Sequence, residues 1–300
     1  MSHFSVMVIG GDVDLQLQPF HEFECTGIDD EFVRDVDITA EVQARIENGQ
    51  AESLEGALGW FEIDGKVVTH EDEVDRTCNH KYGFAIVQDG KLVKAVRRTN
   101  PNKKWDWWQL GGRWAGFFKL KPGATGVRGK NGLLGSCNNE GAGYADQVRK
   151  GDVDFDGMRD AAGREAGEQF DRVHAVIAGR DWQSWKHLWN VVHKGDANAA
   201  REAYNTQPVV ADLREADLLG WGNDLERYRV TREQYVQRAS AAAIATFAVL
   251  KDGQWFERGR MGWWGTVSDE KDIETWAREF GALIDSLPDD TLLTVVDCHI

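Results

Sequence analysis

The residues best suited to chemistry are concentrated at 100–118, which contains four of the thirteen tryptophans. Asp106 offers a carboxylate that could act as a general base, and Arg113 a planar guanidinium that fits a carboxylate or phosphate. Gly111 and Gly112 permit positive φ angles and close backbone approach, and the indoles offer faces for stacking. These features predict a pocket for a small planar anion, such as a nucleotide-like molecule. The expected ligand-binding residues here are Trp105, Asp106, Trp108, Gly111, Gly112, Arg113 and Trp114.

The same segment also fits a purely structural role. Trp105 and Trp107 alternate, as residues on one buried strand face do, and Asp106 and Arg113 could form an ion pair. The Gly-Gly-Arg sequence matches neither a Walker loop nor a G-x-G-x-x-G dinucleotide turn. Core packing is therefore the alternative interpretation, and no phosphate-binding loop is predicted.

A second tryptophan pair, Trp263 and Trp264, lies between two glycines. Because glycine lets the backbone bend, one indole could face the core and the other a cleft. We expect both to add to the binding site, with core packing again as the alternative.

The chain ends in Asp297-Cys298-His299-Ile300, within a predicted strand. Neighbouring strand residues face opposite sides, so Asp297 and His299 could act together whereas Cys298 points away. An ordinary terminal strand with a buried cysteine is the alternative. Asp106 and His299 are the candidate catalytic residues, and whether the protein is an enzyme stays open.

Metal and cofactor sites are not predicted. His21, Cys25, Cys78 and His80 are of metal-ligand types, but none of their spacings matches a zinc site. The four cysteines form no C-x-x-C pair, which indicates reduced thiols. Neither a Gly-x-Ser-x-Gly elbow nor a His-Glu-x-x-His helix occurs.

Charge and hydropathy restrict the class of protein. The net charge of −15 argues against direct binding of DNA or RNA, because phosphate contacts need clustered Lys and Arg. The acidic residues are dispersed, which is typical of a solvated surface, although an acidic face could dock on a basic protein partner. With no apolar run near the roughly 18 residues of a membrane span and no signal-peptide pattern at the start, we expect a cytoplasmic protein without membrane contact.

Both chain ends are expected to lie in one sheet. Residues 4–10 and 291–300 are short apolar strands rich in β-branched side chains. Residues 84–91 and 247–254 repeat a pattern of apolar strand, Asp-Gly and second strand, which is typical of a hairpin with a type I′ turn. The sequence thus predicts an α+β fold whose mainly antiparallel sheet domain forms from both ends of the chain.

The middle of the chain is predicted to be helical. Apolar spacings of three and four begin near Met158, and Thr231-Arg-Glu-Gln is a capping box. A last helix has its apolar stripe between Ile273 and Leu287, before Pro288. The expected domains are residues 1–125 with 245–300 for the sheet, and 126–244 for a mainly helical insertion.

Four segments together resemble a family of uncharacterised proteins encoded by tailed bacteriophages and prophages. The resemblance implies a viral origin, without any activity or catalytic residues to carry over, and it covers the sheet domain but not the helical middle. The segments are Met-Ser-His-Phe-Ser-Val-Met-Val-Ile-Gly at 1–10, the tryptophan-rich run at 100–114, Met-Gly-Trp-Trp-Gly at 261–265 and the C-terminal run at 287–300.

Two hypotheses of function follow. In the first, a phage accessory protein, with a role in counter-defence, sequesters or processes a nucleotide-like ligand in its tryptophan-rich pocket, with host immune signalling as the setting. In the second, an acidic inhibitor binds a host enzyme through its surface or its helical insertion. Either is compatible with a homo-oligomer.

Overall fold

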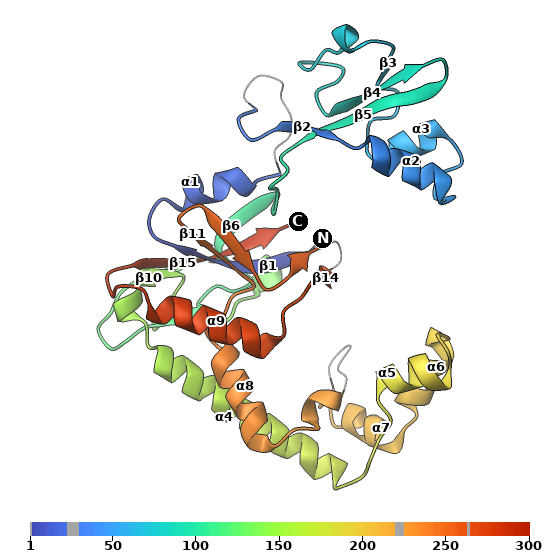
Figure 1. The fold of residues 1–300 in the computed structure, drawn as a ribbon. Helices are drawn as coiled ribbons and strands as arrows, with labels where there is room; N and C mark the ends of the chain where they lie inside the picture. The colour runs from blue at the N-terminus through green and yellow to red at the C-terminus, as the bar shows by residue number, and fades with distance from the viewer. Residues whose placement is uncertain (1, 23–29, 220–224, 263–264) are drawn as a thin grey trace.

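The computed structural model describes residues 2–22, 30–219, 225–262 and 265–300, and it is an α+β protein. Its central sheet is formed by both ends of the chain, which confirms the predicted fold class. Figure 1 shows three parts in a curved arrangement: the central sheet with helix α9, a second smaller sheet beyond one end of it, and a group of helices beyond the other.

The central sheet has the order β12-β11-β1-β15-β6-β8, and β10 also pairs with β15. The two terminal strands β1 and β15 are antiparallel neighbours, whereas β1 with β11 and β6 with β8 are parallel pairs. Its strands are β1 (His3–Ile9), β6 (Trp107–Gly112), β8 (Lys130–Asn131), β10 (Gln147–Arg149), β11 (Ala248–Lys251), β12 (Gln254–Glu257) and β15 (Leu292–His299).

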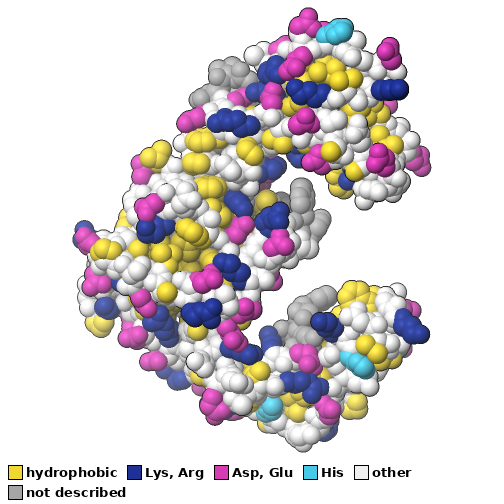
Figure 2. All heavy atoms as spheres, in the orientation of Figure 1, with side chains coloured by type: hydrophobic (Ala, Val, Ile, Leu, Met, Phe, Trp, Pro, Cys, Tyr) yellow, Lys and Arg dark blue, Asp and Glu magenta, His cyan; other side chains and the backbone are white. Residues whose placement is uncertain are grey.

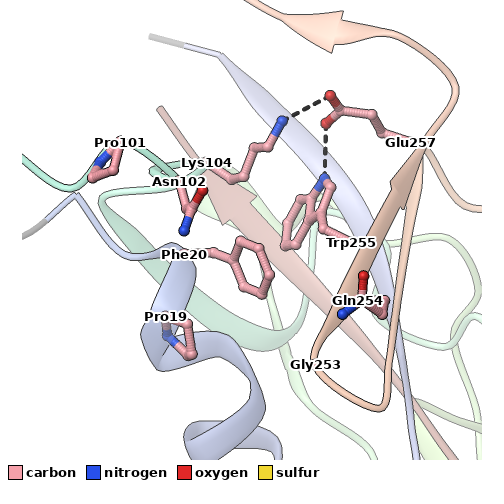
Figure 3. A pocket seen from close by; sticks show the side chains of 9 residues that line it. All are labelled: Pro19, Phe20, Pro101, Asn102, Lys104, Gly253, Gln254, Trp255 and Glu257. Atoms are coloured by element: carbon pink, nitrogen blue, oxygen red, sulfur yellow. Dashed lines mark hydrogen bonds and ion pairs between the residues drawn. The ribbon is translucent and has the colours of Figure 1, made fainter. Parts of the chain in front are cut away.

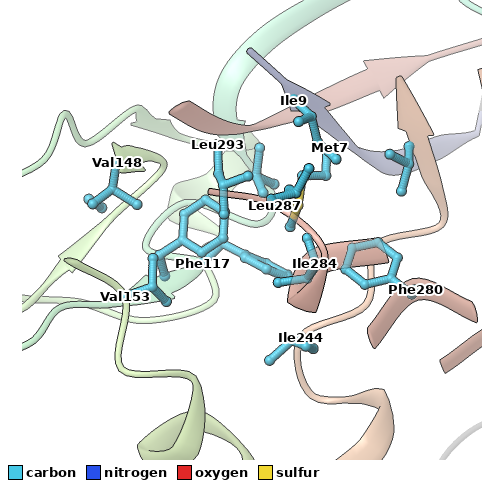
Figure 4. Packing of buried hydrophobic residues seen from close by; sticks show 14 of the residues in the cluster. Met7, Ile9, Phe117, Val148, Val153, Ile244, Phe280, Ile284, Leu287 and Leu293 are labelled. Carbon is cyan, nitrogen blue, oxygen red and sulfur yellow. The ribbon is translucent and has the colours of Figure 1, made fainter. Parts of the chain in front are cut away.

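Helix α9 (Ile273–Asp285) covers one face of this sheet, and it forms where the apolar stripe predicts. The carboxylate of Asp272 accepts the N–H of Thr275 and so caps its first turn. Alternate residues of β1 and β15 pack under the helix with Phe117 and Phe118, which follow β6 in the chain, forming the core of Figure 4. This apolar face is what holds the two chain ends together.

The opposite face of the sheet has its own core. Phe4, Val6 and Val8 of β1 pack there with Trp105 and Cys298. Against this face lies the short helix α1 (Val13–Leu17) with the 3-10 turn Gln18–Phe20.

Burial makes Cys298 a chemical marker of the folded state. The side chain is fully enclosed, and burial together with the nearby carboxylates of Asp297 and Asp106 raises the pKa of its thiol well above the usual value. We therefore expect a thiol reagent at pH 8 to label exposed Cys78 rapidly and Cys298 only on unfolding, as peptide mass spectrometry would measure. Labelling of both at the same rate in native buffer would contradict the placement of β15.

The second sheet has the order β2-β5-β4-β3 and a separate core under helices α2 and α3. Each repeated Asp-Gly pair has positive φ at both residues, 49° and 73° for Asp89-Gly90 and 52° and 72° for Asp252-Gly253, which confirms the predicted turns. The two hairpins, however, belong to different sheets. The elements of this part are β2 (Arg34–Asp37), α2 (Thr39–Glu47), α3 (Leu54–Gly59), β3 (Val67–Val68), a 3-10 turn (Glu71–Glu73), β4 (Gly83–Gln88) and β5 (Lys91–Thr99).

The helices of the third part surround a core of their own. Thr231 and Gln234 form the predicted capping box at the start of α8. The segment Leu188–Val192 is a π-helix, and it leaves Trp189, Val191 and Val192 exposed. The helices are α4 (Phe155–Ile177), α5 (Trp185–His187), α6 (Ala197–Asn205), α7 (Pro208–Glu215), the 3-10 helix Leu225–Tyr228 and α8 (Arg232–Ala242).

Residues 126–149, which lie in the expected insertion, contribute β8 and β10 to the central sheet, and the long helix α4 begins at Phe155. Short strands and turns complete the chain. They are β7 (Phe118–Lys119), β9 (Tyr144–Ala145), β13 (Arg260–Met261), β14 (Val267–Ser268) and the 3-10 turns Leu133–Gly135 and Lys150–Asp152.

Basic side chains are interspersed with acidic ones over the face seen in Figure 2, which also shows a hollow between the second sheet and the helices. Both chain ends lie on the side of the central sheet near this hollow (Figure 1). Within the described ranges, no helix combines the length and the apolar character needed to cross a membrane.

Candidate functional site

The α9-covered face of the central sheet changes from apolar to polar at the chain ends. Strand register places His3 opposite His299 and His299 opposite Trp107, so three rings from β1, β15 and β6 form one row. One step inward, Ser5 lies opposite Asp297 on the same face. Because strand side chains alternate, these residues continue the face that carries Met7 and Val295 in the core.

Each histidine in this row is paired with a carboxylate. His3 Nδ1 lies 2.8 Å from Asp297 Oδ1, and His299 Nδ1 lies 2.7 Å from Asp106 Oδ1. The Asp297 side chain is fully buried and that of Asp106 is 42% exposed. The two imidazoles are themselves in edge-to-face contact, with ring centroids 4.9 Å apart.

This pairing determines which nitrogen of each ring is available. An ionised carboxylate only accepts hydrogen bonds, so each Nδ1 carries a proton and donates it to its aspartate. Among the described residues neither Nε2 has a hydrogen-bond partner. A neutral imidazole held in this way can accept a proton at Nε2, and a protonated one can donate from it. Either imidazole of the site can therefore act as a base when neutral or as an acid when protonated.

Trp107 provides an aromatic surface at the same place. Its ring stacks on His299 at 5.2 Å with an angle of 17° and meets His3 edge-on at 5.4 Å. Since the residue is 41% exposed, part of the indole remains open to a ligand.

Gly111 and Gly112 have a structural reason to be glycines. Both have positive φ, and a Cβ at Gly111 would lie 2.8 Å from Asp146 Oδ2 while one at Gly112 would lie 2.3 Å from Asp297 Oδ2. The buried Asp146 carboxylate accepts the N–H groups of Phe117 and Gly129. The glycine pair therefore allows two buried carboxylates to sit against the turn after β6.

Arg113 joins the site through its backbone. Its N–H donates to Asp297 Oδ2 at 2.9 Å, while its side chain is exposed and forms no ion pair with a described residue. The Asp106–Arg113 ion pair of the core-packing interpretation does not form, and Asp106 binds His299 instead. Its exposed guanidinium can meet an anion.

The other predicted binding residues are distributed around the sheet. Trp105 is buried on the opposite face, where its Nε1 donates to the Leu17 carbonyl, and Trp108 packs there beside Cys298. Trp105 and Trp107 do not share a face, because β6 begins only at Trp107. Trp114 lines a pocket next to His3. The predicted Trp263 and Trp264 lie outside the described residues.

His3 and Trp107 were not predicted as site residues, and Asp297 was considered only as a residue that could act together with His299. Asp297 and His299 share a face as predicted, but each pairs with a residue from another strand rather than with the other. Placing both termini in one sheet could have revealed His3, since it is the first residue of β1 and faces the last residue of β15.

Two of the cavities lined by described residues adjoin the central sheet. One, of about 340 Å³, is next to His3 on the α9 side. The other, of about 480 Å³, is on the opposite side between the 3-10 turn after α1 and the β11–β12 hairpin (Figure 3). The charged groups that line this second cavity already have partners there. Glu257 forms an ion pair with Lys104 and accepts the Trp255 indole N–H, each at 2.8 Å. The cavity beside His3 is therefore the better candidate for a ligand.

The fold and the site define an α+β protein with two adjoining histidine–aspartate pairs on the polar end of a sheet. In the part of the chain that the structure describes, no group of three or more His, Cys, Asp or Glu side chains could hold a metal ion. No family model, curated protein or solved structure matches this chain.

Proposed function

We propose that the protein binds a small nucleotide-like anion at the His3–His299 row and carries out acid–base chemistry on it. The observation that supports this proposal is the pair of imidazoles, each held by a carboxylate at Nδ1 and each with Nε2 unpartnered among the described residues. Trp107 adds a surface for stacking, and the exposed Arg113 side chain adds a positive charge for an anionic group.

The chemistry we propose is hydrolysis of a phosphate ester. One Nε2 takes a proton from water while the water oxygen forms a bond to phosphorus. The other imidazole, in its protonated form, gives its proton to the leaving oxygen as the phosphorus–oxygen bond breaks. Each aspartate orients its ring and stabilises the protonated state without entering the bond changes.

The test is a panel of nucleoside mono-, di- and triphosphates and cyclic nucleotides, with binding measured by calorimetry and products by chromatography. We expect His3→Ala and His299→Ala each to lower turnover by about 10²–10⁴-fold. Arg113→Ala should weaken binding by roughly 10- to 100-fold, as loss of a charge-assisted hydrogen bond would. His70→Ala, on an exposed turn of the second sheet's part, is the control and should stay within about twofold of the wild type in both assays.

Absence of binding by every member of the panel at millimolar concentration would reject this function. A ligand bound equally well by the wild type, His3→Ala, His299→Ala and Arg113→Ala would reject this site.

A second candidate function is inhibition of a host protein, favoured by the exposed Trp189, Val191 and Val192 on the π-helix. It predicts a stoichiometric partner that is retained by His3→Ala and lost by Val191→Asp in pull-downs. For either function, the resemblance to phage-encoded proteins leads us to propose an accessory role in the infected host's cytoplasm, including counter-defence.

A further inference from the structure

The cavity beside His3 has a wall made of small residues. Ala242 at the end of α8, Ala245 in the following linker and Ala277 on α9 all line it. Helices α8 and α9 pack against each other, and alanines at these positions leave space between them and the sheet. At about 340 Å³, the cavity is at the small end of the range for ligand pockets and suits one ring system rather than a dinucleotide.

Two tryptophans, Trp114 and Trp276, also line the cavity. Trp276 is fixed in place, since its indole N–H donates to the Thr246 carbonyl at 2.7 Å. Trp114, which lines this cavity, directly follows Arg113 in the chain. The same turn therefore carries a residue of the cavity wall and the exposed Arg113 guanidinium. Flat apolar walls of this kind favour a planar ring.

Arg258 gives the cavity a polar feature. Its Nη2 forms an ion pair with Glu270 Oε1 at 2.7 Å, and its guanidinium carbon lies over the Phe247 ring, 5.4 Å from the centroid. A guanidinium carries five N–H donors, and those that remain accessible can donate to an acceptor that a ligand brings to this wall. Carbonyl oxygens and ring nitrogens of nucleobases are such acceptors.

We infer that this cavity is the base-binding pocket of a mononucleotide, with the phosphate placed at His3, His299 and Arg113. The inference rests on the proposed function and specifies its ligand: one nucleoside whose base has an acceptor edge. His3 lines the cavity and also belongs to the row of rings, so base and phosphate sites are continuous. The mononucleotide therefore occupies both the base site and the phosphate site.

The experiment compares Ala242→Phe with Ala241→Phe by calorimetry, using GMP, AMP, CMP, UMP and inorganic phosphate. Ala242 lines the cavity, whereas its neighbour Ala241 is exposed on the same helix. We expect Ala242→Phe to weaken binding of the preferred nucleotide at least 30-fold and to leave phosphate binding within twofold. Ala241→Phe should bind both as the wild type does, and matching circular dichroism of the two variants verifies the fold.

Equal nucleotide affinity in Ala242→Phe and the wild type would overturn the base pocket while leaving the His3–His299 site in place. Loss of phosphate binding in Ala242→Phe alone would also overturn it, because the substitution would then act on the site as a whole. Failure of the wild type to bind any of the five probes would reject the proposed function and this inference with it.

Discussion

Gly112→Ala is expected to lower the free energy of unfolding by roughly 2–5 kcal/mol. The residue has φ of 58°, and a left-handed conformation costs an alanine about 1–2 kcal/mol. An added Cβ would also lie 2.3 Å from Asp297 Cβ, and relief of such crowding in a packed site costs roughly another 1–3 kcal/mol. The effect is measured as the loss of unfolding free energy in urea and as a fall in Tm of roughly 3–8 °C.

Gly135→Ala is the matched control. This glycine also has positive φ, 77°, but nothing lies within 4 Å of where its Cβ would be. The Gly135→Ala variant should lose only the conformational part of the unfolding free energy, roughly 1–2 kcal/mol. Equal losses in the two variants would show that Gly112 matters for its backbone angles alone, and would contradict the close packing of Asp297 against the turn.

Asp297→Asn is expected to reduce turnover of the ligand by about 10²–10⁴-fold, the size of a general acid–base contribution. The carboxylate accepts from both His3 Nδ1 and the Arg113 N–H, but an amide has only one oxygen. If that oxygen keeps the Arg113 N–H, the amide NH₂ faces His3 Nδ1, which must then be an acceptor. The His3 proton moves to Nε2, and the nitrogen facing the ligand can no longer act as a base.

This change of tautomer can be measured without knowing the ligand. In the wild type, ¹⁵N NMR of His3 should show a protonated Nδ1, and in Asp297→Asn a protonated Nε2. Asp146→Asn makes the same substitution in a buried carboxylate that binds only backbone N–H groups among the described residues, so the His3 tautomer should not change. An unchanged His3 spectrum in Asp297→Asn would refute the role given to this pair.

Local patterns in the sequence account for much of the architecture. Helix α9 forms at its predicted apolar stripe, α8 begins at its capping box, and both Asp-Gly pairs adopt the predicted turn angles. These features depend on residues a few positions apart, whose spacing directly reflects helix or strand periodicity. The apolar, β-branched ends likewise sufficed to predict that both termini enter one sheet.

Local sequence patterns do not predict which sheet each hairpin joins. The pairs Asp89-Gly90 and Asp252-Gly253 have nearly the same local sequence and the same turn, yet one hairpin is in the second sheet and the other extends the central sheet. The residues of the turn determine how the two strands of a hairpin pair with each other. Which other strands lie beside the hairpin depends on packing with segments that are distant in the sequence.

The composition of the tryptophan-rich segment and the residue types at the C-terminus are properties of the sequence, and they directed attention to Asp106, Arg113 and His299. Tertiary structure decided their roles. His3 and Asp297 are 294 positions apart and Asp106 and His299 are 193 apart, so no local spacing relates them. They meet because the apolar faces of β1 and β15 pack under α9 and β6 pairs with β15 in a fixed register, which leaves the polar strand ends side by side.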